Sequence, residues 1–229
     1  MRQLKTLRKR RDIELKRFNR WFIYLLGMCV LALGITLNTK TGLGVSPIIS
    51  VAFCVSELFS LNFGNMTFLL YALFVVVQLF LRDKNERMAT LLQIIISLIF
   101  SQLLNLFAYM ITYDSNVHGL TSNLLLLLAA VALTGIGVSL SVNMVLIPNP
   151  GDGIVQAIAQ KAKWEQGFAK NVFDISCVIV TAVVGLLLSG RIIGIGLGTV
   201  VAMVGVGRVV ALTNFLFKDK MCSAAGLTH

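Results

Sequence analysis

Long apolar runs separated by short polar stretches dominate the chain. Eight hydrophobic segments run roughly over 21–38, 46–60, 65–81, 89–112, 123–146, 152–162, 168–188 and 192–217. Runs of about 20 apolar residues match the ~30 Å hydrocarbon core of a bilayer, so the pattern predicts an all-α polytopic membrane protein. Six segments are long enough to span it. The segments "SPIISVAFCVSELFS" and "DGIVQAIAQKA" would reach only about 22 Å and about 17 Å at ~1.5 Å per residue, too short to cross.

Each short segment follows a stretch that breaks a helix, "GLGVSP" in the first half and "IPNPGDG" (147–153) in the second. A shift of 103 residues without gaps aligns identical residues in the two halves: Gly34 with Gly137, Leu37 with Leu140, Leu43 with Leu146, Pro47 with Pro150 and Gly64 with Gly167. An odd number of spans in each half gives the halves opposite topology. The pattern therefore predicts six spanning helices plus two re-entrant half-helices, arranged as two inverted 3-helix repeats.

Charges in the loops favour the same topology. Residues 1–20 carry nine Lys or Arg against Asp12 and Glu14, a net +7, which predicts a cytoplasmic N-terminus. If 46–60 is re-entrant, the basic loop "RDKNER" (82–87) also lies in the cytoplasm, whereas a spanning 46–60 would place it outside. We expect a basic tail (1–20), a first membrane repeat (21–112), an external loop (113–123), a second membrane repeat (124–217) and a cytoplasmic C-terminal tail (218–229).

Composition excludes several classes of protein. The chain is 57% hydrophobic and 13% charged, with a mean hydropathy of +0.85, whereas soluble domains are roughly 25% charged. The net charge of +10 lies mostly in the tail, where it suits anionic lipid headgroups better than nucleic acid. The four cysteines lack metal-ligand spacing, and no hydrolase or metalloprotease motif occurs. We therefore expect no enzyme activity, no metal and no cofactor. The glycines of "GIGLGTVVAMVGVG" (194–207) favour close helix packing over a nucleotide loop.

The two breaks are the predicted site. Irregular backbone at membrane depth is tolerated only inside protein or beside a wet cavity. Pro47 and Pro150 suit the first helical turn, with Ser46 and Asn149 as caps. Free N–H groups and the helix dipole make such ends suitable for an anion or polar group, so we expect the second break, including Gly151, Asp152 and Gly153, to form half of a midplane site. The alternative is that both breaks are ordinary interfacial turns between spanning helices.

Charged residues within the apolar segments are the second indication of a site, because each is costly at the centre of a membrane helix. Asp174 lies about six residues into the seventh segment, and Arg208 lies at a similar depth in the eighth, so the two could pair. Asn171 precedes Asp174 by one turn on the same face. A structural salt bridge, or an Arg208 that snorkels to the interface, is the alternative. Tyr71 takes the place of Asp174 in the first half, and Glu57 is expected at an interface.

The motifs "TGLGVSPIIS", "PNPGDGIVQAIAQ", "KNVFDISCVIV" and "GIGLGT" together resemble the YczE/YyaS/YitT family of bacterial integral membrane proteins over residues 20 to 217. The family's Pro-Gly-Glu/Asp-Gly break is matched by 150–153, and its Phe-Asp-x-Ser by Phe173, Asp174 and Ser176. Gly196 and Leu197 stand where many relatives have Arg-Glu, and Arg208 is additional. The resemblance implies a bacterial inner-membrane protein and supplies no substrate.

These patterns favour a secondary transporter of a small polar or anionic solute, with the site at the two breaks and with Asp152 or Asp174 available for a coupling ion or proton. A passive channel-like facilitator is the main alternative, since paired half-helices also build pores. A lipid flippase and a non-transporting accessory protein stay open as well. So does a homodimer.

Overall fold

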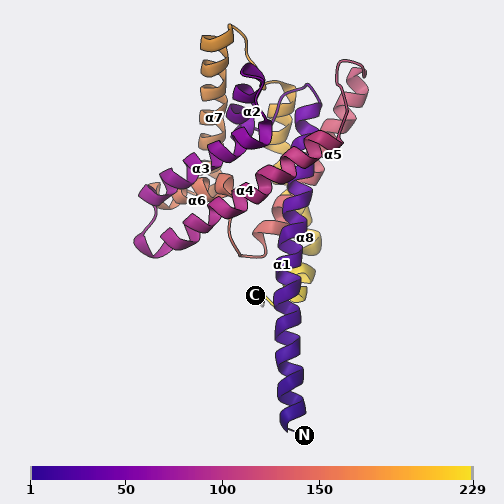
Figure 1. Cartoon of the computed structure of the whole chain (residues 1–229), viewed down its shortest axis with the longest axis vertical. Helices are drawn as coiled ribbons and strands as arrows, with labels where there is room; N and C mark the ends of the chain where they lie inside the picture. The colour runs from indigo at the N-terminus through magenta and orange to yellow at the C-terminus, as the bar shows by residue number, and fades with distance from the viewer. Residues whose placement is uncertain (1, 228–229) are drawn as a thin grey trace.

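The computed structural model describes residues 2–227, with side chains from Leu15 to Leu227. Within this range the chain is all-α (Figure 1) and its elements follow in this order: α1 (Arg2–Lys40), α2 (Pro47–Leu58), α3 (Phe63–Leu81), the 3-10 helix η1 (Lys84–Glu86), α4 (Arg87–Met110), α5 (Leu120–Val142), α6 (Pro150–Ala162), α7 (Gln166–Ser189) and α8 (Leu197–Ala224). Each of the eight predicted segments corresponds to one of these α-helices.

Six helical stretches of the described chain are long and apolar enough to cross a membrane, as predicted: Leu15–Lys40, Phe63–Leu81, Lys84–Met110, Leu120–Val142, Gln166–Ser189 and Leu197–Ala224. The other two helices, α2 and α6, have 12 and 13 residues. At ~1.5 Å per residue they reach about 18 Å and about 20 Å, well short of a ~30 Å hydrocarbon core. In Figure 1 α6 lies across the long helices at about the middle of the bundle.

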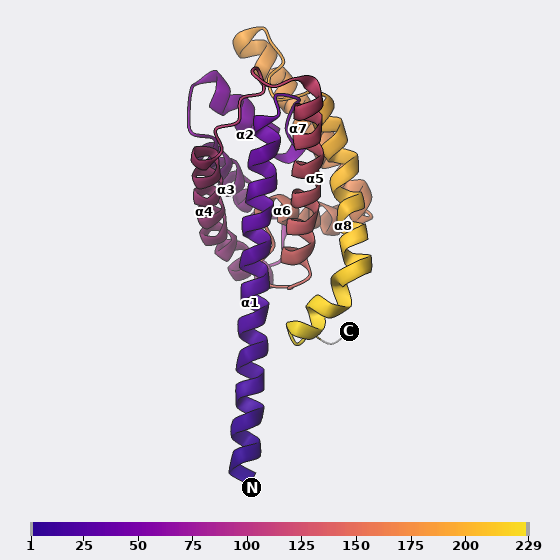
Figure 2. The ribbon, with the colours of Figure 1, turned by 90° about the vertical axis from the view of Figure 1, so that its right-hand side faces the viewer.

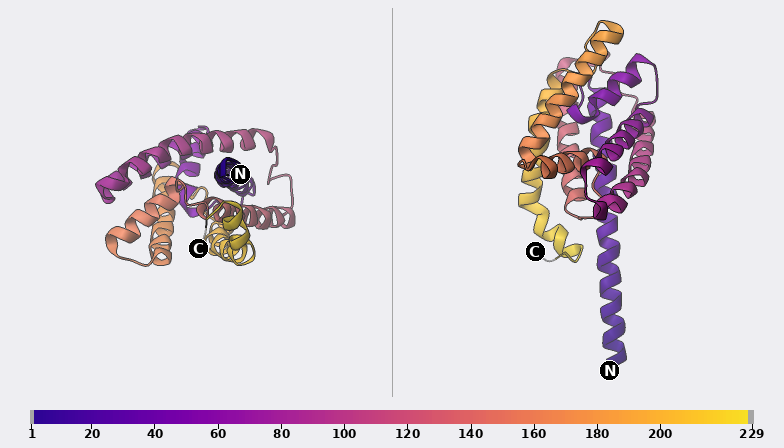
Figure 3. Two further views of the ribbon diagram at one scale, coloured as in Figure 1. Left: turned by 90° about the horizontal axis from the view of Figure 1, so that it is seen from below. Right: turned by 90° about the vertical axis from the view of Figure 1, so that its left-hand side faces the viewer.

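Helices α1 and α5 form the central pair and run side by side in opposite directions (Figure 2). Their backbones meet at two glycines. A Cβ on Gly34 would lie 2.5 Å from the Thr134 nitrogen, and a Cβ on Gly137 would lie 2.7 Å from the Leu31 Cα. Only glycine allows this approach, because the obstructing atoms are backbone atoms that cannot rotate away. Seen from below, α1 lies between the α3–α4 pair and the α5–α8 pair (Figure 3, left).

The short helices pack against spans of the opposite half of the chain. Helix α2 packs on α7, where the hydroxyls of Ser50 and Thr181 share a 2.6 Å hydrogen bond. Helix α6 packs on α3, where a Cβ on Gly153 would lie only 2.6 Å from the Oε1 of Gln78. That glutamine exchanges two amide hydrogen bonds of 3.0 and 3.1 Å with Gln93, and both side chains are fully buried. The polar groups of both contacts are therefore satisfied within the protein.

The third and fourth helices of each half pack differently. Helix α3 lies along α4, and a Cβ on Gly64 would lie 2.5 Å from the Ser101 carbonyl oxygen. Gly167, which aligns with Gly64, has no atom within 4 Å of such a Cβ, and α7 packs mainly on α2 and α6. The second half is therefore the more open of the two.

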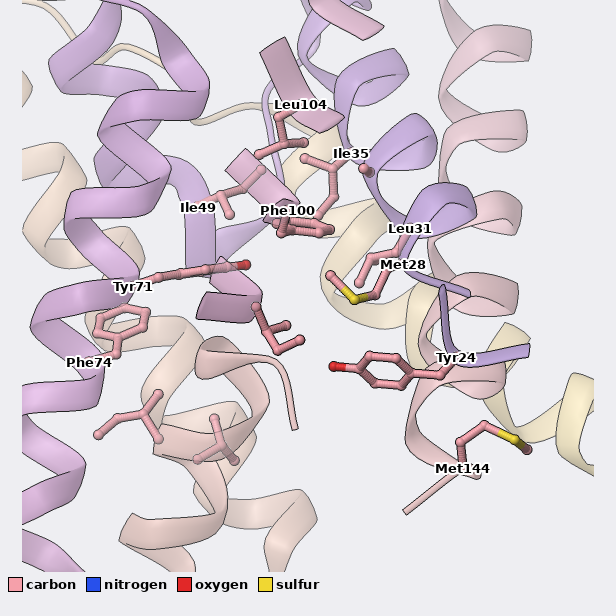
Figure 4. Close-up of a cluster of buried hydrophobic side chains, with 14 of the residues drawn as sticks. Tyr24, Met28, Leu31, Ile35, Ile49, Tyr71, Phe74, Phe100, Leu104 and Met144 are labelled. Atoms are coloured by element: carbon pink, nitrogen blue, oxygen red, sulfur yellow. The ribbon is translucent and has the colours of Figure 1, made fainter. Parts of the chain in front are cut away.

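A cluster of buried side chains fills the space where α1, α2, α3, α4 and α6 meet (Figure 4). Its members labelled in Figure 4 are Tyr24, Met28, Leu31, Ile35, Ile49, Tyr71, Phe74, Phe100, Leu104 and Met144. Many large apolar side chains of α3, α4, α7 and α8 are instead exposed on the outer surface. An apolar exterior around a partly polar interior is what a bilayer requires of a spanning bundle.

Three helix boundaries in the structure differ from the predicted ones. Helix α5 ends at Val142 rather than at 146, because Val145 takes a left-handed conformation with φ 48° and the chain turns there. Helix α8 begins at Leu197 rather than at 192, after a loop in which Gly194 has φ 78°. Helix α1 begins at Arg2, so the basic stretch continues the first span without a break.

The predicted contacts of the basic tail with anionic lipids fall largely on residues 2–14, whose side chains lie outside those described. Residues 228 and 229 of the C-terminal tail also lie outside the described chain.

Candidate functional site

The first break leaves the N-terminus of α2 without a side-chain cap. Ser46 occupies the N-cap position, but its hydroxyl makes no capping hydrogen bond. Pro47 follows as the first helical residue, is buried and has no N–H to satisfy. The Ile49 N–H donates to the Ser46 carbonyl at 3.2 Å, whereas the Ile48 N–H makes no such turn bond. The Ser46 hydroxyl and the Ile48 N–H are therefore available to a ligand.

Backbone hydrogen bonds from the α7–α8 loop cover the other side of the first break. The Val45 N–H donates to the Gly194 carbonyl at 2.9 Å, and the Gly198 N–H donates to the Leu43 carbonyl at 2.7 Å. The glycine-rich stretch at the start of α8 thus serves close packing, as predicted, and its partner is the backbone of the break. Such pairing makes irregular backbone tolerable at membrane depth.

The second break caps α6 internally. The Asn149 side chain accepts a 3.0 Å hydrogen bond from the Gly151 N–H, and Pro150 is the first helical residue. The preceding loop is attached to α1, because the Tyr24 hydroxyl donates to the Ile147 carbonyl at 2.8 Å. The predicted capping role of Asn149 is confirmed, whereas Ser46 makes no equivalent bond.

Two arginines satisfy further carbonyl groups of the second break. Arg20 donates to the carbonyls of Met144 and Val145 at 2.7 and 2.5 Å. Arg82, on the chain just after α3, donates to the Gly153 carbonyl at 3.2 Å. Charged donors make stronger hydrogen bonds than neutral ones, so both ends of this break are firmly held.

The two breaks meet at one small cavity. A Cβ on Gly151 of α6 would lie 3.1 Å from the Cγ2 of Ile48 in α2 and 3.6 Å from the Tyr71 hydroxyl. The cavity beside this contact has a volume of about 60 Å³, and its polar lining consists of Ser46, Tyr71, Thr134, Asn149, Asp152 and Lys170. In Figure 4 Tyr24 and Tyr71 point their hydroxyls toward the middle of the cluster from opposite sides.

Three charged groups lie at or beside this cavity. Lys170 lines it and donates to Asp174 Oδ2 at 2.8 Å. The Asp174 carboxylate is 1% exposed, and its other oxygen, Oδ1, has no hydrogen-bond partner. Asp152 also lines the cavity, is half-buried, and forms no salt bridge with any side chain from Leu15 to Leu227.

The predicted pair between Asp174 and Arg208 is wrong. Asp174 binds Lys170 on its own helix, and Arg208 is exposed on the outer side of α8. Helix α7 packs on α2 and α6, which turns the carboxylate away from α8. Asn171 is also exposed and does not line the cavity. Gly153 faces Gln78 rather than the cavity.

A larger cavity of about 380 Å³ adjoins the second break. It shares Asn149 with the small cavity and extends past Ser141 and Gln156 to Arg82 and Glu86. The last two form an ion pair of 3.3 Å at the 82–87 loop. A volume of this size lies in the range of small-molecule sites, and the shared Asn149 connects the loop side of the bundle to the two helix ends.

The sequence prediction missed Lys170, Thr134 and Tyr71 as lining residues. Lys170 falls within the predicted seventh segment (168–188), and its i,i+4 spacing from Asp174 could have identified the ion pair. Tyr71 was placed at the position equivalent to Asp174, and it does share the cavity with Lys170. Thr134 carries no signal of its own, because a threonine in a span commonly bonds its own backbone, as this one does to the Ala130 carbonyl.

Comparison with known proteins agrees with the membrane architecture. The chain is 24% identical over 159 residues to the "Uncharacterized membrane protein YczE" of Bacillus subtilis (strain 168), which covers 69% of this chain and 71% of that protein. This match confirms the resemblance drawn from the motifs. No solved structure matches the chain. The model of a family of unknown function, DUF6198, matches residues 18–215, and the chain belongs to this family.

Proposed function

We propose that this protein is a secondary transporter of a small polar or anionic solute, and that the solute binds where the N-termini of α2 and α6 meet. One observation carries the proposal: two helix starts, one from each half of the chain, line the same polar cavity inside a bundle of six spanning-length helices. Helix starts offer backbone N–H groups and partial positive charge, and Lys170 adds a full charge to the same cavity.

The proposal includes two inverted repeats with α2 and α6 as re-entrant half-helices. The contacts described above support it, because they are reciprocal under the 103-residue shift. Gly34 meets Thr134 as Gly137 meets Leu31, and Leu31 is the position equivalent to Thr134. The contact of Ser50 with Thr181 likewise corresponds to that of Gly153 with Gln78. A two-fold axis between the antiparallel α1 and α5 would produce this reciprocity, as in transporters built from inverted repeats.

We also propose that the protein lies in a bacterial inner membrane with both termini in the cytoplasm, as the basic tail and the 82–87 loop favour. In that orientation the 380 Å³ cavity faces the cytoplasm, because Arg82 and Glu86 line it. A cysteine at Asn62, introduced into a background without the four native cysteines, should then react with an impermeant maleimide on intact cells. A cysteine at Asn85 should stay unlabelled until the cells are permeabilised.

The size of the two cavities suggests how the solute would move. The inner cavity has a volume of about 60 Å³ and the outer cavity about 380 Å³, so only the outer one lies in the size range of small-molecule sites in this conformation. Backbone pairs of Val45 with Gly194 and of Gly198 with Leu43 close the first break. A small inner cavity beside a larger one favours a carrier over a continuously wide pore.

Uptake into proteoliposomes tests the proposal. The reconstituted protein is offered radiolabelled inorganic phosphate, acetate, glycine and glutamate. We expect saturable uptake of at least one of them, and Ser46→Val should lose most of it because the hydroxyl lines the cavity. Ser176→Val is the matched control, since Ser176 is exposed on α7 and bonds only its own backbone.

The same vesicles separate the alternatives. A flux that rises linearly with solute concentration and does not saturate would show that the protein is a passive facilitator and not a carrier. Translocation of a fluorescent lipid without uptake of any solute would show that the protein is a lipid flippase. Equal uptake by protein-free liposomes for all four probes would contradict transport of these solute classes.

A further inference from the structure

The charges around the inner cavity do not balance. Asp152 and Asp174 contribute two negative charges, and Lys170 contributes one positive charge. The positions equivalent to them under the 103-residue shift are Ile49, Thr67 and Tyr71, which carry no charge at neutral pH. These three positions therefore supply no compensating charge, and the group of Asp152, Lys170 and Asp174 has one carboxylate in excess.

Among the side chains from Leu15 to Leu227, no other one that lines the cavity restores the balance, and Arg82, which donates to the Gly153 carbonyl, is itself paired with Glu86. Helices α1 and α5 present Leu31, Ile35, Thr134 and Val138 to the cavity, and α3 presents Tyr71. Helix α2 contributes Ser46 and two isoleucines to the lining, while its Glu57 is exposed at the far end. On α7 the other titratable side chain near Asp174 is Cys177, a buried thiol.

The two carboxylates are placed differently with respect to the single amine. Lys170 is bound to Asp174, whose Oδ1 is buried and has no donor. Asp152 lines the cavity and forms no salt bridge with any side chain from Leu15 to Leu227. Asp174 is buried and Asp152 is half-buried, and a carboxylate removed from water without a counter-charge is disfavoured, so the one that Lys170 does not neutralise gains a proton or a cation. A volume of about 60 Å³ has room for one ion or a water next to Asp152.

We propose that Asp152, Lys170 and Asp174 form a site for one monovalent cation, a proton or an ion the size of Na⁺, and that this cation couples to solute transport. The coupling rests on the proposed function, whereas the occupancy of the site does not. Lys170 acts as the internal counter-ion that limits the site to one cation. Lys170 can neutralise either Asp152 or Asp174. The carboxylate that is not paired with Lys170 then binds the cation.

Infrared spectroscopy of the reconstituted protein counts protonated carboxyl groups directly. The films are prepared at neutral pH in choline chloride, and the carboxylic acid band is identified by its shift on exchange into D₂O. We expect one protonated carboxyl per wild-type chain. Asp152→Asn and Asp174→Asn should each abolish the band, because the remaining carboxylate then pairs with Lys170. Lys170→Gln should double it, and Lys170→Arg should leave it at the wild-type intensity.

Controls and the sodium arm complete the test. Glu57→Gln should leave the band unchanged, because Glu57 is exposed and remote from the cavity. If sodium chloride in place of choline chloride removes the wild-type band, the cation is Na⁺; a band that stays assigns the site to a proton. Absence of the band in wild-type protein, or a band that Asp152→Asn does not change, would overturn the proposal. A correct band pattern without uptake of any solute would instead remove the transport function and leave the cation site standing.

Discussion

Gly137 on α5 is the position where the packing of the central helix pair can be tested most directly. An alanine Cβ there would lie 2.7 Å from the Leu31 Cα and 2.8 Å from the Gly27 carbonyl oxygen. Carbon atoms in contact need about 3.5 Å, so α1 and α5 would have to separate by about 0.8 Å. Overpacking of this kind costs about 1–3 kcal/mol, and alanine returns about 0.5–1 kcal/mol through its better helix propensity. Gly137→Ala should therefore destabilise the protein by up to about 2.5 kcal/mol.

Gly207→Ala is the matched control for this substitution. Gly207 is an exposed helical glycine on α8, and a Cβ there would have no atom within 4 Å. Alanine should stabilise this position by about 0.5–1 kcal/mol, since only the propensity changes. Both variants can be compared in denaturant titrations of the detergent-solubilised protein, followed through the fluorescence of Trp21 and Trp164. Equal stability of the two variants would refute the close approach of α1 to α5.

Three further substitutions probe the breaks and the membrane surface. Tyr24→Phe removes the part-buried bond to the Ile147 carbonyl and should lower the free energy of unfolding by about 0.5–1.5 kcal/mol in the same titration, whereas no change would show that α1 does not hold this loop. Gln78→Leu leaves the buried Gln93 without its amide partner and should lower the free energy of unfolding by about 1–3 kcal/mol. Replacing both glutamines by leucine should recover part of this loss. Fully additive effects of the two substitutions would contradict the reciprocal pair. Arg208→Leu should leave the infrared band unchanged and should not lower the stability, because Arg208 is exposed on α8. Loss of the band would show that Arg208 belongs to the site.

The helices and the breaks could be predicted because each depends on local chemistry. Apolar length defines the six spans, and each break is a short stretch in which proline and glycine occur together with polar residues. Pro47 and Pro150 lie at the first helical turn, as expected from their missing N–H groups. The end of α5 was placed too late because residues 143–146 include apolar side chains, and the left-handed conformation of Val145 is a property of the loop that Arg20 holds.

Side-chain partners between helices were less predictable. The depth of Asp174 and Arg208 in their spans suggested a pair, but depth does not fix the rotation of a helix about its axis. That rotation follows from the packing of α7 on α2 and α6, which depends on the hydrogen bond between Ser50 and Thr181 and on many apolar contacts. Lys170 pairs with the Asp174 carboxylate because it lies on the same face of α7, one turn away.

The meeting of α2 and α6 is the feature on which the proposed site depends, and a disulfide cross-link tests it. Cysteines replace Ile48 and Gly151 in a background without the native cysteines, where a Cβ on Gly151 would lie 3.1 Å from the Ile48 Cγ2. Disulfides need Cβ atoms about 3.8 Å apart, so this pair should cross-link on mild oxidation in native membranes. The control pair joins Ile48→Cys with Gly167→Cys, which has no neighbour within 4 Å, and should stay reduced. If both breaks were instead interfacial turns between spanning helices, their starts would lie about 30 Å apart on opposite faces, and the absence of any cross-link between residues 48 and 151 would contradict the shared site.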